Sequence, residues 1–224
     1  MKNYFLALSI FITTFCQSQS WDYYGSSGFS SDISNYLSLG IDLPSGDMYL
    51  AYQNIGDTGK LNISAYLNSS SNWTNIASGF SNGYANNISL DVDVNGNPYY
   101  SYIDGAGDFI GFNYLKNTGL WAPKNPSNGG GNIGSHSVNS ITKEDVGGQL
   151  FICSYHYSWR LVIYKAQNIG SGFSINHNFG QLGDQNISQI SFDIKYNSGY
   201  IAYSNLDDNG KIDVINFDGN SLDV

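Results

Sequence analysis

A serine-led segment recurs at a constant interval along the chain, and this repeat constrains the fold more than any other feature. The segments are Ser38-Leu-Gly-Ile-Asp, Ser89-Leu-Asp-Val-Asp, Ser140-Ile-Thr-Lys-Glu and Ser191-Phe-Asp-Ile-Lys, and each begins 51 residues after the previous one. A fixed period of about this length is typical of repeat folds, in which each repeat buries its apolar face against its neighbours.

Each repeat is predicted to contain four short strands. A second strand follows each serine segment and ends in a small residue and a tyrosine, at Ala51-Tyr52, Ser101-Tyr102, Ser154-Tyr155 and Ala202-Tyr203. Third strands are predicted at 61–66, 109–114, 161–164 and 212–217. Trp73 and Trp121 lead fourth strands, and Trp21 lies in the same phase. Four strands per repeat of about 50 residues predict an all-β fold, a β-propeller of about four four-stranded blades.

The composition favours strands over helices. Of the 224 residues 12% are charged, and the chain contains 26 Gly, 18 Tyr and 12 Phe. The exposed faces of helices are normally rich in charge, whereas aromatic residues favour strands and glycines mark turns. The composition therefore agrees with an all-β fold.

Turn residues and aromatic residues lie at regular places in the repeat. Turns between first and second strands are predicted at Ser45-Gly46, Asn95-Gly96, Gly147-Gly148 and Ser198-Gly199, with Asn95-Gly96 read as a type I′ hairpin. A Gly-Phe-Ser loop before the next blade is predicted at Phe29, Phe80 and Phe173, and the third repeat has 129–131, three glycines, there instead. Because their phase recurs, Trp73 and Trp121 are expected to be largely buried between blades.

The order of these motifs resembles a repeat found in large secreted bacterial propeller proteins. That pattern is Trp, Gly-Phe-Ser, Ser-Leu-x-x-Asp, Gly-x-Pro-Tyr-x-x-Tyr-x-Asp and a Lys-led strand. Trp73, 79–81, 89–93 and 96–104 match it best, and the likeness covers nearly the whole chain after residue 20. The resemblance implies the blade and says little about function, because propellers host many functions.

Closure of the ring leaves three alternatives. The segment at Trp21 could pair with the strand at 212–217 and close a ring of four blades, which is the preferred interpretation. The last residues, 222–224, align with the same slot. This competition is also what part of a larger propeller would show, or a chain that completes its ring by oligomerising.

Residues 1–20 read as a secretory signal, followed by a propeller domain over 21–224. Lys2 precedes an apolar run at 4–15, and cleavage is expected after Ser18 or Ser20. Lipidation of Cys16 is the competing interpretation. No second apolar stretch follows, so we expect a secreted or cell-surface protein that is not integral to a membrane. Cleavage leaves Cys153, which we expect to be a buried, inert thiol rather than a nucleophile.

The aromatic stretch around Arg160, the only arginine, is the main candidate for ligand binding. Tyr157, Trp159 and Arg160 could stack against a sugar and bind a polar group, or the aromatic residues could belong to the interblade core. Asn54, Asp104, Tyr157 and Asn205 follow the second strands. They could surround the mouth of the central channel, or they could simply cap turns.

A weak calcium candidate lies at Asp91, Asp93 and Asn95. Alternating oxygen ligands before a glycine suit a calcium loop, but Tyr102 stands where the bidentate glutamate is expected. A strand that ends in a hairpin is the alternative interpretation. No other metal or cofactor site is predicted.

The charge and the residue pattern limit the possible functions. The net charge of −9 argues against binding to nucleic acid or to an anionic membrane. Glu144 is the only glutamate, and the three histidines have no metal or nucleophile–base spacing. We therefore expect a non-enzymatic binding module for a glycan or a protein. The alternatives are a surface scaffold without a small ligand and a glycoside hydrolase-like enzyme with an unrecognised site.

Overall fold

The computed structural model of this chain describes residues 24–25, 27–28, 30–106, 108–123, 136–143, 150–156, 160–166, 173–181, 187–195, 198–217 and 222–223. They form four four-stranded antiparallel sheets, each a meander in which consecutive strands are neighbours. We call these sheets blades one to four. The predicted all-β propeller architecture with four blades is confirmed.

The strand bounds follow the repeat. Blade one contains β1 (Ser34–Asp42), β2 (Asp47–Asn54), β3 (Lys60–Leu67) and β4 (Asn72–Ala77). Blade two contains β5 (Ala85–Val92), β6 (Pro98–Asp104), β7 (Phe109–Leu115) and β8 (Leu120–Pro123). Blade three contains β9 (His136–Lys143), β10 (Leu150–His156), β11 (Arg160–Ala166) and β12 (Phe173–Gln181). Blade four contains β13 (Ile187–Lys195), β14 (Ser198–Asn205), β15 (Lys211–Phe217) and β16 (Leu222–Asp223), with a short 3-10 helix, η1 (Leu206–Asp208), between β14 and β15.

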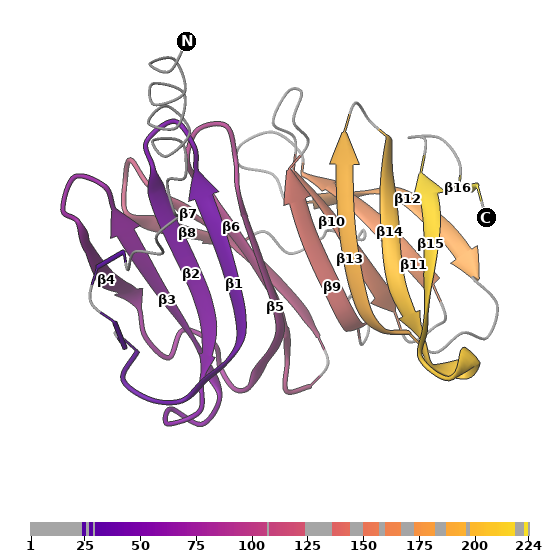
Figure 1. The fold of residues 1–224 in the computed structure, drawn as a ribbon, viewed down its shortest axis with the longest axis horizontal. Helices are drawn as coiled ribbons and strands as arrows, with labels where there is room; N and C mark the ends of the chain where they lie inside the picture. Colours follow the sequence, from indigo (N-terminus) through magenta and orange to yellow (C-terminus); the bar gives the residue numbers. More distant parts are fainter. Residues whose placement is uncertain are drawn as a thin grey trace, which may run out of the picture.

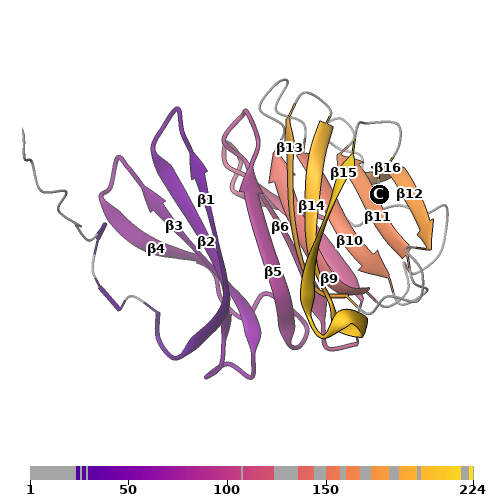
Figure 2. The same ribbon diagram turned by 45° about the vertical axis from the view of Figure 1, so that its right-hand side comes forward.

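The blades stand in a row, and the first strands of successive blades, β1, β5, β9 and β13, lie next to one another (Figure 1). The row does not close on itself. Blade one, in indigo, lies at one side in both views, and blades three and four lie together at the other, with β5 between β1 and β13 (Figures 1 and 2). Among the described residues no helix has the length and apolar character needed to cross a membrane.

Apolar side chains between neighbouring blades form the core. Tyr49, Ala51 and Ile63 of blade one pack with Leu90 and Val92 of blade two. A second cluster joins blade three to blade four and includes Phe151, Cys153, Ile163, Phe192 and Ile194. Each cluster therefore fills the junction between two neighbouring blades.

Gly40 allows blades one and two to pack closely. A Cβ atom on Gly40 would lie 2.0 Å from Cδ2 of Leu90 and 3.0 Å from Cγ2 of Val92. Any larger residue at position 40 would push blade two away, so the absence of a side chain here allows the two sheets to approach.

The preferred closure of the ring by the N-terminal strand is wrong. The outer partner of β15 is β16, with Asn216 opposite Asp223 and Phe217 opposite Leu222. The C-terminal segment thus occupies the fourth-strand position of blade four, for which the N-terminal segment was the expected competitor. Trp21 lies outside the described residues, and nearby Tyr24 packs on Tyr66 of blade one instead.

Two local expectations also need correction. Phe173 starts β12 opposite Ala166 rather than lying in a loop, because β11 continues to Ala166 and pairs with β12 over this length. Ser198 and Gly199 open β14 opposite Lys195 and Ile194, so they are not the turn. The predicted turn at 147–148 and the loop residue Phe29 lie outside the described residues.

The two tryptophans are half-buried rather than largely buried. Each lies on an outer strand opposite a tyrosine of the third strand, Trp73 beside Tyr66 and Trp121 beside Tyr114. The indole N–H of Trp73 donates to the carbonyl of Tyr24 at 2.8 Å. Because a fourth strand forms the rim of its blade, both tryptophans stay partly exposed, although Trp121 also packs against the apolar cluster between blades one and two.

The first strands of blades one and two share a bulge. Register shifts fall between Asn35 and Ser38 in β1 and between Asn86 and Ser89 in β5. Tyr36, with φ 49°, lies in the first shift, and Asn87, with φ 48°, lies 51 residues later in the second. The serine repeat thus begins directly after a bulge, which fixes the register of the rest of the strand.

Candidate functional site

The turn after the second strand of blade one and the connection from blade one to blade two share one edge of the structure. In blade one the N–H of Ala85 donates to the carbonyl of Gly59 at 2.9 Å, and the N–H of Phe80 donates to the carbonyl of Leu61 at 2.9 Å. These bonds join the β2–β3 turn to the β4–β5 connection. We call this edge the loop face.

Three predicted site residues on the loop face cap their own turns. The side-chain Oδ1 atoms of Asn54, Asp104 and Asn205 each accept the backbone N–H two residues further on, at 3.1, 2.8 and 3.1 Å. Asn54 and Asn205 are also buried. Their recurrence after the second strand is explained by the turn that each one closes, as the alternative interpretation proposed.

The aromatic–arginine stretch is described only in part. Arg160 opens β11 opposite His156 and also pairs with Gln181 of β12. This places it at the predicted junction of the second and third strands of blade three. Tyr157 and Trp159 lie outside the described residues, so the ligand site around Arg160 stays a prediction.

The Gly-Phe-Ser motif at 79–81 has a structural role on this face. Ser81 is buried, and its Oγ accepts the N–H of Leu61 at 3.0 Å and donates to the carbonyl of Gly83 at 2.5 Å. The ring of Phe80 packs on Trp121, with centroids 4.8 Å apart. The motif therefore fastens the connection both to blade one and to blade two.

Tyr84 is an exposed aromatic residue of this face that the sequence analysis did not single out. Its side chain is 57% exposed. A Cβ atom on Gly59 of blade one would lie 2.3 Å from its ring, and a Cβ on Gly105 of blade two would lie 3.8 Å from its own Cβ. Tyr84 thus lies between glycine turns of two blades. The repeat gives no signal for it, because the residue 51 positions earlier is Ile33.

Amide groups lie beside the ring of Tyr84. The Nε2 atom of Gln53 would be 3.3 Å from a Cβ on Gly59, and it donates to the carbonyl of Ala85 at 3.0 Å and to Oδ1 of Asn86 at 3.2 Å. An open aromatic ring next to polar amides can stack on the apolar face of a sugar while hydroxyl groups find hydrogen-bond partners.

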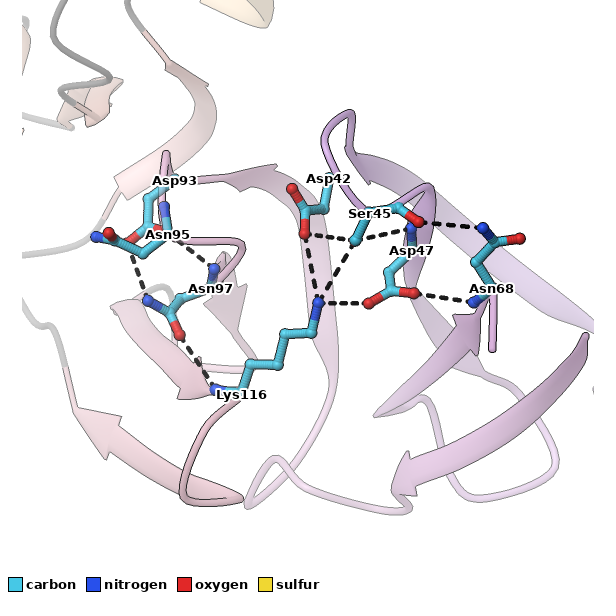
Figure 3. Close-up of polar contacts among 8 residues, drawn as sticks. All are labelled: Asp42, Ser45, Asp47, Asn68, Asp93, Asn95, Asn97 and Lys116. Atoms are coloured by element: carbon cyan, nitrogen blue, oxygen red, sulfur yellow. Dashed lines mark hydrogen bonds and ion pairs between the residues drawn. The ribbon is translucent and has the colours of Figure 1, made fainter. Parts of the chain in front are cut away.

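The opposite edge carries a polar cluster that joins blades one and two (Figure 3). The ammonium group of Lys116, from the β7–β8 hairpin, donates to Asp47, to Asp42 at 3.4 Å and to Ser45 at 3.5 Å, all in the β1–β2 hairpin. Asp47 also accepts the backbone N–H of Asn68 at 2.9 Å. Both aspartates are buried, so the lysine neutralises charge that water reaches poorly.

The pKa shifts in this cluster follow from these bonds. Burial opposes ionisation of Asp47, but the hydrogen bond from Lys116 and the backbone N–H of Asn68 outweigh it, so the pKa of Asp47 is lowered. Burial likewise disfavours the charged form of Lys116, but the hydrogen bond to Asp47 outweighs it, so the pKa of Lys116 is raised. The cluster is therefore a charged latch between two blades.

The calcium candidate is a hairpin that its own side chains close. Oδ1 of Asp93 accepts the N–H groups of Asn95 and Asn97 at 2.8 and 2.9 Å, and Oδ2 accepts Nδ2 of Asn97 at 3.2 Å (Figure 3). Asp91 accepts the N–H of Val92 at 2.7 Å. Within the described part of the chain, no three or more His, Cys, Asp or Glu side chains group as metal ligands.

The turn type in that hairpin differs from the expectation. A type I′ turn needs positive φ at both central residues, but only Gly96 has it, at 76°. The N–H of Gly96 donates to the carbonyl of Asp93 at 3.0 Å, and the N–H of Asp93 donates to the carbonyl of Asn97 at 3.0 Å. This is a type I turn followed by a glycine bulge.

Cys153 is fully buried in the junction of blades three and four. Burial raises the pKa of its thiol well above the usual value, which disfavours the thiolate that a nucleophile needs. This agrees with the predicted inert thiol.

The fold is shared with propeller lectins and glycoside hydrolases. No protein-family model and no curated protein sequence matches the chain. The SapL1 lectin in complex with α-methyl fucoside is 9% identical, with a TM-score of 0.58 over 84% of this chain and 60% of that one. The six-bladed fucose-recognising lectin of Aleuria aurantia is 15% identical, with a TM-score of 0.56 over 85% and 62%.

The solved structure of an enzyme resembles this chain to a similar degree. An α-L-arabinofuranosidase from Clostridium thermocellum is 12% identical, with a TM-score of 0.52 over 85% of this chain and 70% of that one. The chain spans about 60% of the length of the two lectins. At these identities the comparisons establish the propeller fold.

Proposed function

We propose that the loop face binds a glycan and that Tyr84 is the stacking residue. The observation that carries the proposal is the position of this ring, 57% exposed between the glycine turns of blades one and two. An exposed ring beside glycine turns offers an apolar surface on which a sugar ring can stack. The propeller lectins that share the fold support a sugar as the ligand.

A binding module is favoured over a hydrolase by the state of the carboxylates on this face. Asp104 accepts two backbone N–H groups of its own turn, at 2.8 and 2.9 Å. Asp57 pairs with Lys60 at 3.8 Å, and Asp208 pairs with Lys211 at 2.8 Å. These groups hold the turns in shape, whereas glycoside hydrolysis needs two carboxyl groups that face one scissile bond.

The location proposed for this activity is outside the cell or at its surface. The support is the charged and apolar pattern of residues 1–20 and the resemblance to secreted propeller repeats. Binding through Tyr157, Trp159 and Arg160 of blade three is the second site that this proposal admits on the same face.

A glycan array tests the proposal with the purified protein and the variant Tyr84→Ala. We expect binding of at least one glycan, and a loss of about tenfold in affinity in Tyr84→Ala, the size of one stacking contact. Tyr84→Phe keeps the ring and should retain binding. Tyr24→Ala removes another exposed tyrosine, far from the loop face, and should bind like the parent.

Three outcomes separate the alternatives. If Trp159→Ala loses binding and Tyr84→Ala binds like the parent, the site lies on blade three and the role of Tyr84 is contradicted. An array without any bound glycan would contradict glycan binding. Release of chromophore from a panel of chromogenic arabinosides and galactosides would favour the hydrolase.

A further inference from the structure

The aromatic residue that opens the second strand of each blade is buried in three blades and exposed in the fourth. Tyr49, Tyr99, Phe151 and Tyr200 lie opposite residues 40, 91, 142 and 193, which are 51 positions apart. Tyr49, Tyr99 and Phe151 are 0%, 6% and 0% exposed, and Tyr49 and Phe151 belong to the apolar clusters that join their blades to the next ones. Tyr200 is 63% exposed. Blade four therefore presents the face that blades one to three bury.

The third strand of blade four repeats this contrast. Ile63 pairs with Ala51 in blade one, and Val214 pairs with Ala202 in blade four, so the two residues are equivalent. Ile63 is 0% exposed and Val214 is 61% exposed, and Ile212 on the same face is 66% exposed. We call Tyr200, Ile212 and Val214 the blade-four end.

The opposite end of the molecule shows the complementary surface. Leu39 and Ile41 of β1 are 53% and 42% exposed. The residues 51 positions later, Leu90 and Val92, are 6% and 0% exposed because they pack against blade one. The residues 153 positions later, Phe192 and Ile194, are 4% and 2% exposed in the junction with blade three. We call Leu37, Leu39 and Ile41 the blade-one end.

The two ends are therefore the two halves of the interface that the molecule already forms between its own blades. Blade four has Asp193 at the position of Gly40 in blade one. Blade two also has an aspartate at this position, Asp91, and that residue is half-buried. An aspartate at this position is thus compatible with a blade junction. The two ends do not meet within one chain, because β5 stands between β1 and β13 in both views (Figures 1 and 2).

We propose that a second copy of this chain covers these ends, with blade four of each copy packed on blade one of the other. The contact is heterologous, since two different surfaces meet, and two such contacts close a ring. Each chain has four blades, so a ring of two copies has eight, which lies within the usual range of about four to eight blades for propellers. A ring of three copies would exceed that range.

The test is the mass of the purified protein without residues 1–20, which the sequence predicts are removed on export. Light scattering after size exclusion should give twice the mass of one chain. Leu39→Asp places a charge in the blade-one end and Val214→Asp places one in the blade-four end, and each variant alone should be a monomer. Ser69→Asp, on an exposed turn outside both ends, should remain a dimer.

Mixing the two variants separates this arrangement from any other. Leu39→Asp keeps an intact blade-four end and Val214→Asp keeps an intact blade-one end, so the mixture can form one native junction. We expect an open dimer in the mixture, which also shows that both variants are folded. A monomeric parent, a dimeric single variant, or a mixture that stays monomeric would overturn the proposal, and none of these results depends on glycan binding.

Discussion

The ammonium group of Lys116 donates a hydrogen bond to the carboxylate of Asp47, 69 residues earlier in the chain. The bond connects a hairpin of blade two to a hairpin of blade one. The backbone N–H of Lys116 also donates to Asn97 of blade two, and Asp47 accepts the N–H of Asn68 of blade one. It is the polar counterpart of the apolar junction in which Leu90 packs on Gly40.

Loss of this lysine should weaken the junction. In Lys116→Met, Asp42 and Asp47 would stay buried without their cation, and we expect the free energy of unfolding in urea to fall by about 1–3 kcal/mol. Lys60→Met is the matched control, since Lys60 pairs with Asp57 at 3.8 Å on an open surface and should cost under about 1 kcal/mol. Equal losses in both variants would show that the latch does not hold the blades.

The stability of the junction should depend on pH in the acid range. Because the pKa of Asp47 is lowered from 3.8 in the folded protein, its contribution is present above that value and disappears as the pH falls through the lowered one. The raised pKa of Lys116 acts at the other limit, where stability is lost as the pH rises through the folded value. Urea midpoints between pH 6 and pH 2 should fall less in Lys116→Met than in the parent, and parallel curves would contradict the assignment.

Gly96 should not tolerate a side chain. Its φ is 76°, and an added Cβ would lie 2.6 Å from Oδ2 of Asp42 in blade one. We expect Gly96→Ala to lower the unfolding free energy by at least about 1 kcal/mol, from backbone strain and displacement of the aspartate. Gly83→Ala meets nothing within 4 Å and should change stability by less than about 0.5 kcal/mol in the same urea titration.

Ser81 should contribute more than an exposed serine. Ser81→Ala removes the acceptor for the buried N–H of Leu61, which costs about 1–3 kcal/mol when no other partner replaces it. Ser70→Ala removes an exposed hydrogen bond from Ser70 to the carbonyl of Leu67, so the melting temperature of this variant should stay near that of the parent. A Ser81→Ala melt that matches the parent would mean that another group, such as water, satisfies Leu61.

The thiol of Cys153 should be unreactive in the folded protein. It is fully buried, and its raised pKa leaves little thiolate at neutral pH. Ellman's reagent should therefore label it only after denaturant is added. Rapid labelling of the native protein would show that the junction of blades three and four opens often.

The repeat predicted the blades because each one has the same strand order and the same junction. The third strand was predicted at 61–66 in blade one and spans Lys60–Leu67. The sequence also indicated that β16 could fill the last slot of blade four. The choice of the N-terminal strand was wrong because strand pairing depends on where the ends of the row lie, and local sequence does not contain that information.

The candidate site was harder to predict for a physical reason. Asn54, Asp104 and Asn205 were visible because they recur, and residues that recur in a repeat are those that build it. Tyr84 does not recur, and only the structure shows that its ring lies against Gly59 while its side chain stays 57% exposed. A binding residue that is present at one junction alone therefore cannot be found from the sequence repeat.

Among the described residues the main contacts between blades join neighbours, and this has a consequence for how the protein loses structure. In such an array, stability is approximately the sum of a term for each unit and a term for each neighbouring pair. The first and last blades each have one neighbour within the chain, so unfolding of the monomeric variants Leu39→Asp and Val214→Asp should begin at the ends and progress inward. Native-state hydrogen exchange should accordingly be slowest in β6 and β10 and faster in β2 and β14, giving a gradient along the row instead of a single cooperative transition.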